Sequence, residues 1–336
     1  MKTPRLYRLH RLVGLAAAGF LVLFAATGML IPFKDRLLAL THPRLFGEAP
    51  GARPADLDTL VGAAAAAVPG GSVIWLRPAV TPGGAVTARV AAPEAGKVLV
   101  VLAPDAALRG VIDPSRDPVL LAVDFHGSLL LGNAGHAGVM VLALPAIGAT
   151  LLGLWLWLRI RVAGKPIAWR RLSTWHRGIG AMATLPLLLL AMSGLVLAAL
   201  PWMPETPPPP TSTAPLPPLS LAATAAGAAF PEHRLAQVNP GEPGGVHQLR
   251  LADRFGRLVV VEVAADGIPR PEAGPAGLAD GLTRLATAIH GWTFLGALSP
   301  AVTLLLGLLV LAMGGSGVWM WVRRRPAPRR PAAARR

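Results

Sequence analysis

Four of the eight histidines in this sequence recur at matched positions, and an imidazole can ligate a metal or transfer a proton. His10-Arg11 recurs as His176-Arg177, 166 residues later, and His126-Gly127 recurs as His290-Gly291, 164 residues later. The histidines without a counterpart are His42, His136, His233 and His247. The spacing therefore selects two pairs of candidate functional residues, His10 with His176 and His126 with His290.

Two equivalent histidines in a duplicated chain can face each other across the axis that relates the two halves. That is the arrangement of two axial imidazoles on one planar macrocycle, and haem iron accepts histidine ligands of this kind. Pairs taken from different ends would lie a membrane thickness apart, about 30 Å. The duplication predicts two bis-histidine haem sites. The alternative is that each histidine is an ordinary interfacial or helix-capping residue.

The segments that must carry these histidines are long and apolar. The chain has 336 residues, of which 53% are hydrophobic and 15% are charged, a balance typical of membrane proteins. A spanning helix needs roughly 20 mostly apolar residues. We predict such helices over residues 12–33, 137–158, 179–200 and 301–322. The first is too long for the apolar part of a signal peptide, so we expect it to remain as an anchor.

The net charge of +15 is distributed in clusters next to these predicted spans. Basic residues precede the first span, fill the short loop between the second and third, and follow the fourth. The positive-inside rule places all three clusters and both termini in the cytoplasm. The long segments 34–118 and 203–285 then lie outside the membrane on the opposite side. This placement predicts contact with a lipid bilayer and argues against nucleic acid as a partner.

The chain contains no cysteine. Disulfides, thiolate-bound iron–sulfur clusters and the covalent attachment of c-type haem are therefore excluded. Any metal chemistry must rest on histidine, methionine or carboxylates.

The duplication extends beyond the histidines. Matched pairs in the spans are Gly14 with Gly180, Thr27-Gly28 with Ser193-Gly194, Gly153 with Gly317, and Trp155 and Trp157 with Trp319 and Trp321. Pro82-Gly83-Gly84 in the first outer segment matches Pro243-Gly244-Gly245 in the second. We predict an α-helical membrane protein with four transmembrane helices arranged as two parallel repeats, each consisting of span, outer module and span.

The outer segments have the patterns of small α+β modules. In the first, residues 56–68 predict an Ala-rich helix, and 72–76, 85–91 and 97–102 predict strands. The second copy runs from 219 to 266, after a stiff polyproline-type stretch at 207–213. The predicted domains are a first membrane helix (1–33), an outer module (34–118), an outer-surface segment with the second helix (119–160), a cytoplasmic loop (161–174), a third helix (175–202), a Pro-rich linker (203–217), a second module (218–285), an outer-surface segment with the fourth helix (286–322) and a basic cytoplasmic tail (323–336).

The position of His126 raises a difficulty for the outer pair. One straight helix over residues 120–158 would be about 58 Å long, too long for a single crossing. We therefore expect a break at Gly132-Asn133-Ala134-Gly135, with the His126 segment along the outer membrane surface. His136 is the rival ligand of the outer haem.

The motifs Leu9-His10-Arg11, Phe125-His126-Gly127 and Ile289-His290-Gly291, in this order and spacing, resemble the PepSY-associated transmembrane family over about residues 5–325. The outer modules resemble its PepSY domains. The resemblance implies a protein of the bacterial inner membrane with both outer modules in the periplasm, similar to ferric-siderophore reductases that bind b-type haems. It assigns the haem-ligand role to the same four histidines.

Some relatives carry a fused cytoplasmic flavin and nicotinamide reductase module. This chain shows no such module, so we expect a separate electron donor: a flavoprotein, reduced flavin or the quinone pool.

The resulting functional hypothesis is a membrane oxidoreductase with two haems b that conducts electrons to a periplasmic acceptor, with a ferric siderophore preferred. Such transfer needs no catalytic acid or base. Candidate docking residues on the outer modules are Arg77, Arg89, Arg250 and Arg254. The first alternative is a cofactor-free PepSY-type module that binds a protein or peptide. The second is a transporter, which the near absence of ionisable residues inside the spans disfavours.

Overall fold

The computed structural model describes residues 3–49, 51–94, 96–162, 171–202, 214–272 and 278–323. The chain divides into two compact units. The helical unit comprises Met1–Ala26, Met140–Met192 and Leu305–Arg336, and the sheet unit comprises Thr27–Val139 and Ser193–Leu304. The polyproline stretch at 207–213, most of the predicted cytoplasmic loop and the basic tail after Arg323 lie outside the described residues.

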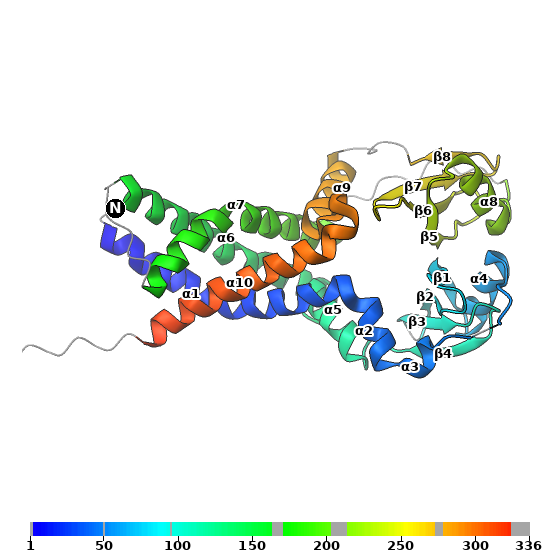
Figure 1. Ribbon diagram of the computed structural model, residues 1–336, viewed down its shortest axis with the longest axis horizontal. Coiled ribbons are helices and arrows are strands. Elements are labelled where there is room, and N and C mark those ends of the chain that lie inside the picture. Colours follow the sequence, from blue (N-terminus) through cyan, green and yellow to red (C-terminus); the bar gives the residue numbers. More distant parts are fainter. Residues whose placement is uncertain are drawn as a thin grey trace, which may run out of the picture. The chain divides into compact units, whose positions relative to one another are not determined.

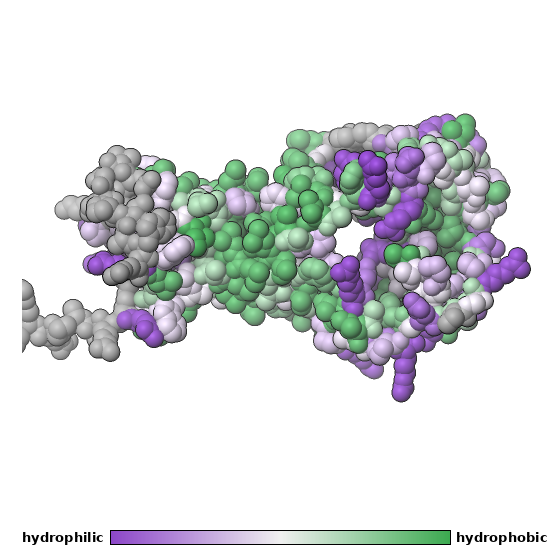
Figure 2. All heavy atoms as spheres, viewed as in Figure 1, coloured by the Kyte–Doolittle hydropathy of each residue, from purple (hydrophilic) through white to green (hydrophobic). Residues whose placement is uncertain are grey.

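Four helices are long and apolar enough to cross a membrane. They are α1 (Thr3–Leu30), α6 (Gly132–Val162), α7 (Leu172–Ala199) and α10 (Ser299–Val322) (Figure 1). Hydrophobic residues cover these helices in Figure 2. The four predicted spans are thereby confirmed as helices, and the chain is a multi-pass membrane α+β protein. The helices extend past the apolar windows, because a helix continues through flanking polar residues that retain helical propensity.

The break before α6 lies a few residues earlier than predicted. Helix α5 (Pro118–Ser128) ends where Leu129 and Leu130 adopt left-handed conformations, with φ of 53° and 62°. The predicted breakpoint at Gly132-Asn133-Ala134-Gly135 overlaps the break only at Gly132, which also has a positive φ of 55°, whereas the next three residues lie in the first turn of α6. Gly135 allows this arrangement: a Cβ there would lie 1.5 Å from the Ser128 carbonyl oxygen, so only glycine lets the two helices approach.

The last membrane helix is preceded by a similar break. Helix α9 (Leu278–Gly291) ends at Trp292, which has a left-handed φ of 52°. The short 3-10 segment η3 (Thr293–Leu298) leads into α10 and contains Gly296 at a φ of 56°. Each outer histidine, His126 on α5 and His290 on α9, therefore lies on a short helix that is separate from the long helix after it.

The strands of both outer segments form one eight-stranded antiparallel sheet in the order β4-β3-β2-β1-β5-β6-β7-β8. The strands are β1 (Ser72–Arg77), β2 (Val86–Ala92), β3 (Gly96–Leu102), β4 (Leu108–Ile112), β5 (Arg234–Asn239), β6 (His247–Ala252), β7 (Leu258–Val263) and β8 (Pro269–Pro271). The three strands predicted in the first segment are confirmed, and β4 and β8 are additional. The two segments join where β1 pairs with β5, with Leu76 opposite Val238, so neither strand remains an open edge.

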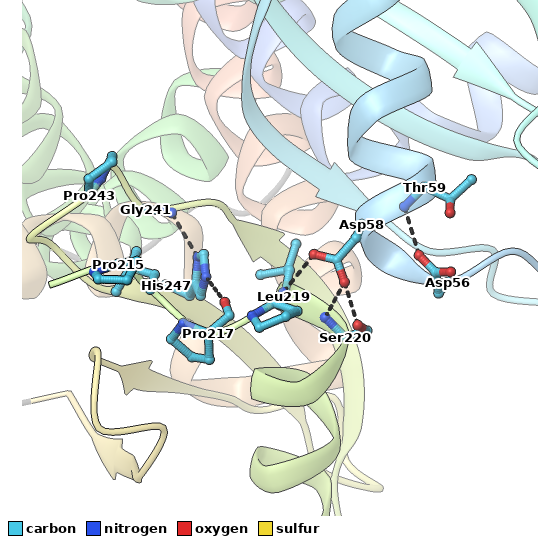
Figure 3. A pocket seen from close by; sticks show the side chains of 12 residues that line it. Asp56, Asp58, Thr59, Pro215, Pro217, Leu219, Ser220, Gly241, Pro243 and His247 are labelled. Carbon is cyan, nitrogen blue, oxygen red and sulfur yellow. Dashed lines mark hydrogen bonds between the residues drawn. The ribbon is translucent and has the colours of Figure 1, made fainter.

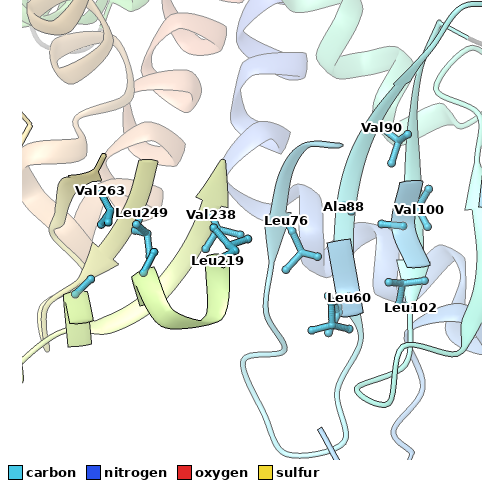
Figure 4. Close-up of a cluster of buried hydrophobic side chains, with 14 of the residues drawn as sticks. Leu60, Leu76, Ala88, Val90, Val100, Leu102, Leu219, Val238, Leu249 and Val263 are labelled. Atoms are coloured by element: carbon cyan, nitrogen blue, oxygen red, sulfur yellow. The ribbon is translucent and has the colours of Figure 1, made fainter. Parts of the chain in front are cut away.

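Helices α4 (Leu57–Ala66) and α8 (Leu219–Ala229) cover one face of this sheet. The contacting helical residues include Ala64, Ala222 and Ala226, all at most 1% exposed, and their small side chains allow close packing on the strands. Alternate strand residues such as Leu76 and Val238 fill the layer between helices and sheet (Figure 4).

A second cluster lies on the other face of the first segment. Helices α2 (Lys34–Thr41), α3 (Pro43–Phe46) and α5 contribute to it, and Leu38 packs there with Leu99 and Val101 of β3.

Asp58 links the two outer segments through the first turn of α8. Its carboxylate accepts hydrogen bonds from the backbone nitrogens of Leu219, at 2.7 Å, and Ser220, at 3.0 Å, and from the Ser220 hydroxyl (Figure 3). Pro218, at the N-cap position of α8, offers no side-chain acceptor. The N-terminus of α8 is therefore capped by a residue that lies about 160 positions earlier in the chain.

Replacing Asp58 with Ala should loosen α8 and the β1–β5 junction. Loss of a cap costs about 0.5–1 kcal/mol when the carboxylate is exposed, as it is here. Hydrogen exchange of the full-length protein should show faster exchange at the amides of Leu219 and Ser220. Asp56→Ala is the matched control, since Asp56 caps only α4 through the Thr59 nitrogen, at 2.7 Å. Equal loss of α8 protection in both variants would contradict this role.

The same link should weaken in acid. Burial raises the pKa of Asp58, but the hydrogen bonds from Ser220 and Leu219 outweigh it and hold the pKa below its usual value. A lowered folded-state pKa stabilises the protein above the ordinary carboxylate pKa of about 4, and this contribution is lost as the pH falls through the lower folded-state value. Exchange at α8 in the wild type should therefore approach that of Asp58→Ala only at strongly acid pH.

Candidate functional site

His10 and His176 face each other inside the helical unit. His10 lies on α1 and His176 on α7, their ring centres are 6.5 Å apart, and the ring planes are inclined by 64°. Both side chains are half-buried. The structure thus brings together the first pair that the duplication selected.

The hydrogen bonds of this pair determine which ring nitrogens are free. His10 Nδ1 lies 3.0 Å from the Ala149 carbonyl oxygen on α6, and a carbonyl can only accept, so Nδ1 carries the proton. His176 Nδ1 lies 2.8 Å from Ser316 Oγ on α10, and this hydroxyl donates to the Met313 carbonyl at 3.1 Å. Ser316 therefore accepts from His176. Both histidines keep Nε2 unprotonated, with a lone pair available for a metal.

His126 and His290 form the second pair, inside the sheet unit. His126 lies on α5 and His290 on α9, with ring centres 6.0 Å apart and planes inclined by 51°. Nδ1 of His126 lies 3.3 Å from Thr27 Oγ1, and Nδ1 of His290 lies 3.2 Å from Ser193 Oγ. A hydroxyl within a helix commonly donates to the carbonyl one turn earlier, and its oxygen then accepts from the histidine. The second pair is thus bonded through Nδ1 like the first.

Each of the four imidazoles packs against a glycine of a neighbouring helix. A Cβ added to Gly28 would lie 2.7 Å from Cε1 of His126, and one on Gly194 would lie 3.0 Å from Cε1 of His290. The corresponding distances are 3.1 Å from Gly153 to His10 and 3.7 Å from Gly317 to His176. We call these four residues the glycine seats. All four belong to glycine pairs that recur between the halves of the sequence. At Gly28, Gly194 and Gly153 a Cβ would crowd the ring, whereas one on Gly317 would be at ordinary van der Waals distance.

The ring separations fit two imidazoles on opposite sides of one metal. An imidazole nitrogen binds a metal at about 2 Å and the ring centre lies roughly 1 Å behind it, so two such rings have centres about 6 Å apart. The observed values are 6.5 and 6.0 Å. Within the described ranges no group of three or more His, Cys, Asp or Glu side chains is placed to hold a metal. Two facing imidazoles suit a metal whose other ligands come from a macrocycle, and these residues therefore fit haem iron.

The sequence pattern described as the PepSY-associated TM region matches residues 7–324. The chain belongs to this family. The match covers nearly the whole chain and includes all four paired histidines and all four glycine seats. A comparison with curated proteins gives no match. The resemblance inferred from the histidine motifs is confirmed at the level of the PepSY-associated family.

The unpaired histidines of this PepSY-associated protein have other surroundings. His136 lies on α6, forms no ring pair within the described part of the chain, and its buried Nδ1 has no hydrogen-bond partner there. His42 Nε2 lies 2.7 Å from the buried carboxylate of Asp117, which caps α5. His247 bonds the Pro217 carbonyl beside a hollow of about 790 Å³ at the junction of the outer segments (Figure 3). His42 and His247 therefore have structural partners, and the geometry favours His126 over His136 for the outer pair.

Three of the four candidate docking arginines lie on one face of the sheet, because Arg89 is opposite Trp75, two residues from Arg77, and Arg250 is opposite Gln237, to which Arg77 donates. Arg77 is bound by Asp35, at 3.0 Å, and donates to Gln237, at 2.9 Å. Burial lowers the pKa of Arg89, with the Asp124 carboxylate acting in the opposite direction. The other two, Arg250 on β6 and Arg254 in the turn after it, have no carboxylate partner among the described residues.

Sequence reasoning missed the groups that orient the imidazoles. Ala149 acts through a backbone carbonyl, which leaves no trace in residue type. Ser316, Thr27 and Ser193 are polar residues within apolar helices, and residue type alone does not show which group they bind. The usable signal was the adjacency of Thr27 to Gly28 and of Ser193 to Gly194, since each dipeptide supplies both the hydrogen bond and the seat of one histidine.

The seats predict opposite effects of two Gly→Ala substitutions on helix α1. Gly28→Ala forces Cβ against the His126 ring and should destabilise the protein by about 1–3 kcal/mol. Gly14→Ala meets no atom within 4 Å and should be neutral or stabilising by up to about 1 kcal/mol, because alanine favours the helix. Thermal unfolding of both variants in detergent gives the comparison. Destabilisation of similar size in both variants would show that Gly28 has no special role.

Proposed function

We propose that this PepSY-associated protein is a membrane haem oxidoreductase of the bacterial inner membrane. It would conduct electrons through two bis-histidine haems b from a cytoplasmic or membrane donor to a periplasmic acceptor. The acceptor we propose is a ferric siderophore. The observation that carries the proposal is that four histidines, selected by duplication, face each other in two pairs, each bonded through Nδ1.

The chain's own residues would hold and orient the two cofactors. Bound haem would supply reversible one-electron chemistry at iron. His10 with His176, and His126 with His290, would offer their Nε2 atoms as axial ligands. The Ala149 carbonyl and the hydroxyls bonded to the other three Nδ1 atoms would set ring orientation and ligand basicity. The glycine seats admit the rings between helices, and the apolar helices exclude water.

We further propose that the chain is a tandem repeat with an approximate two-fold axis in each unit. In a two-fold arrangement, a residue and its own equivalent meet only near the axis. His10 contacts His176 in the helical unit, and His126 contacts His290 in the sheet unit. Strands β1 and β5 have the same irregularity, between Val73 and Trp75 and between Leu235 and Gln237, which makes Leu76 equivalent to Val238. These two equivalent residues pair with each other. These contacts support the two parallel repeats predicted from the sequence.

The charge distribution supports a cytoplasmic location for the His10/His176 pair. The helical unit contains no Asp or Glu, because all 17 acidic residues belong to the sheet unit. By the positive-inside rule its basic helix ends face the cytoplasm, with both termini there and the sheet unit in the periplasm. Electrons would then enter near His10 and His176 and leave near His126 and His290.

At the outer side the substrate step is a one-electron reduction of Fe(III) to Fe(II). Siderophore oxygen donors hold Fe(III) more tightly than Fe(II), so reduction favours release of the iron. Arg250 and Arg254 are the better docking candidates for a negatively charged ferric complex, because Arg77 is already paired with Asp35 and Arg89 is half-buried.

Removing the outer ligands distinguishes His126 from His136. In low-temperature electron paramagnetic resonance of the oxidised protein, two low-spin haem signals are expected. His126→Ala should abolish one of these signals or convert it to high spin, while His136→Ala should leave both low-spin signals unchanged. The reverse pattern would assign the outer ligand to His136 and contradict the pairing in the structure.

Mixing the reduced protein with a ferric siderophore under argon tests the acceptor. Haem absorbance should return to the oxidised spectrum, and a ferrous chelator should trap one Fe(II) per electron. The same siderophore loaded with redox-inert Ga(III) is the matched control and should leave the haem reduced. A protein that holds reduced haem but does not react with the ferric complex would require another acceptor.

A further inference from the structure

A hollow of about 280 Å³ lies in the helical unit, lined by Leu6, Leu152, Trp155 and Arg159. Leu6 is one helical turn before His10 on α1. Leu152 directly precedes Gly153, the seat of the His10 ring, on α6. The hollow therefore lies between α1 and α6, about one turn from His10 toward the N-terminus of α1. Pockets for small ligands begin at about 300 Å³, so this space suits one edge of a large flat ligand.

Arg159 presents a cation in this hollow without a protein counter-ion. Its guanidinium carbon lies 5.3 Å from the centre of the Trp155 ring, a distance typical of a cation–π contact. Among the described residues Arg159 has no carboxylate partner. The tryptophan thus holds the guanidinium in place and leaves its hydrogen-bond donors available.

Arg323 occupies the corresponding position in the second half. Its guanidinium carbon lies 4.3 Å from the centre of the Trp319 ring. Each tryptophan follows a glycine seat by two residues, and each arginine follows that seat by six, a rise of about 9 Å along the helix. In the part of the chain that the structure describes, Arg323 likewise has no carboxylate partner. Each of the two helices that seat an inner histidine therefore carries an equivalent arginine near its C-terminal end.

No acidic residue of the helical unit is available to pair with Arg159 or Arg323. The helical unit contains no Asp or Glu, and an arginine at the end of a spanning helix can keep its charge in water or pair it with an anion. A guanidinium pairs best with a carboxylate or phosphate, which it can bind through two parallel hydrogen bonds. The compensating anion would therefore belong to a bound molecule.

We propose that Arg159 and Arg323 bind the two propionate carboxylates of the haem held by His10 and His176. The inference rests on the function proposed above. A haem carries its two propionates on one edge, and the duplicated chain offers one guanidinium to each. The propionate edge would then point toward the ends of α6 and α10, and the space between Leu6, Leu152 and Trp155 would take part of the macrocycle. The other source of a suitable anion is the phosphate of an anionic lipid.

Reconstitution with haem and with haem dimethyl ester separates the two sources. The ester keeps the iron and the macrocycle but has no free carboxylates. When an excess of a haem-scavenging globin is added, wild-type protein should release haem dimethyl ester from the His10/His176 site at least roughly ten times faster than it releases haem. Arg159→Gln and Arg323→Gln should each accelerate loss of the inner haem roughly tenfold and reduce the discrimination against the ester. Arg171→Gln is the control, because it removes the same charge from the same unit and leaves the proposed site intact.

The reduction potential provides a second measurement that does not depend on turnover. Removing a positive charge near the iron favours the ferric state, so each of the two variants should lower the potential of the inner haem, and Arg171→Gln should leave it nearly unchanged. Equal release of haem and its ester by wild type, with no effect of Arg159→Gln or Arg323→Gln, would overturn the proposal. The proposal would also be overturned, in favour of a lipid site, if both substitutions changed the protein's response to anionic lipid but left the rate of haem release unchanged. If wild type binds no haem at all, the proposed function itself fails, and that result is distinguishable from the others.

Discussion

The hydrogen bond made by Nδ1 of each paired histidine is the interaction on which the rest of this architecture depends. A histidine in an apolar helix could rotate or present either nitrogen, but the Ala149 carbonyl and the Ser316 hydroxyl leave only one arrangement for the inner pair. With Nδ1 occupied, Nε2 is the ring nitrogen left free to bind a metal. The glycine seats follow from the same constraint, because a ring held this way needs room beside the neighbouring backbone.

The sheet unit solves a related problem at a larger scale. Two separate four-stranded sheets would leave four open edges, and the pairing of β1 with β5 removes two of them while joining the two outer segments. Asp58 reinforces the joint by capping a helix that belongs to the other segment. The outer histidines lie on short helices, α5 and α9, that end in left-handed residues before the long helices begin. Their pairing therefore depends on the backbone conformation at Leu129 and Trp292.

The long helices, the strands of the first outer segment and the histidine pairing were predictable, because each leaves a periodic or duplicated signal in the sequence. The start of the break before α6 was not predictable, because it lies at Leu129 and Leu130, and leucine rarely adopts the left-handed conformation. Of the two glycines that suggested a break, Gly132 does have a positive φ, whereas Gly135 is needed for close contact with Ser128. The β1–β5 joint was also hidden, because edge pairing between distant segments depends on tertiary contacts. The partner of His10 is a backbone carbonyl, which any residue could supply.

If the paired histidines hold two haems, the purified full-length protein must contain them, so its haem content is the first quantity to measure. A pyridine haemochrome assay should give a b-type spectrum with about two haems per chain. His176→Ala and His290→Ala should each lower the value to about one, because each removes one ligand of a different pair. A protein that remains colourless after reconstitution with haem would contradict the account and leave a cofactor-free PepSY-associated binding module as the function.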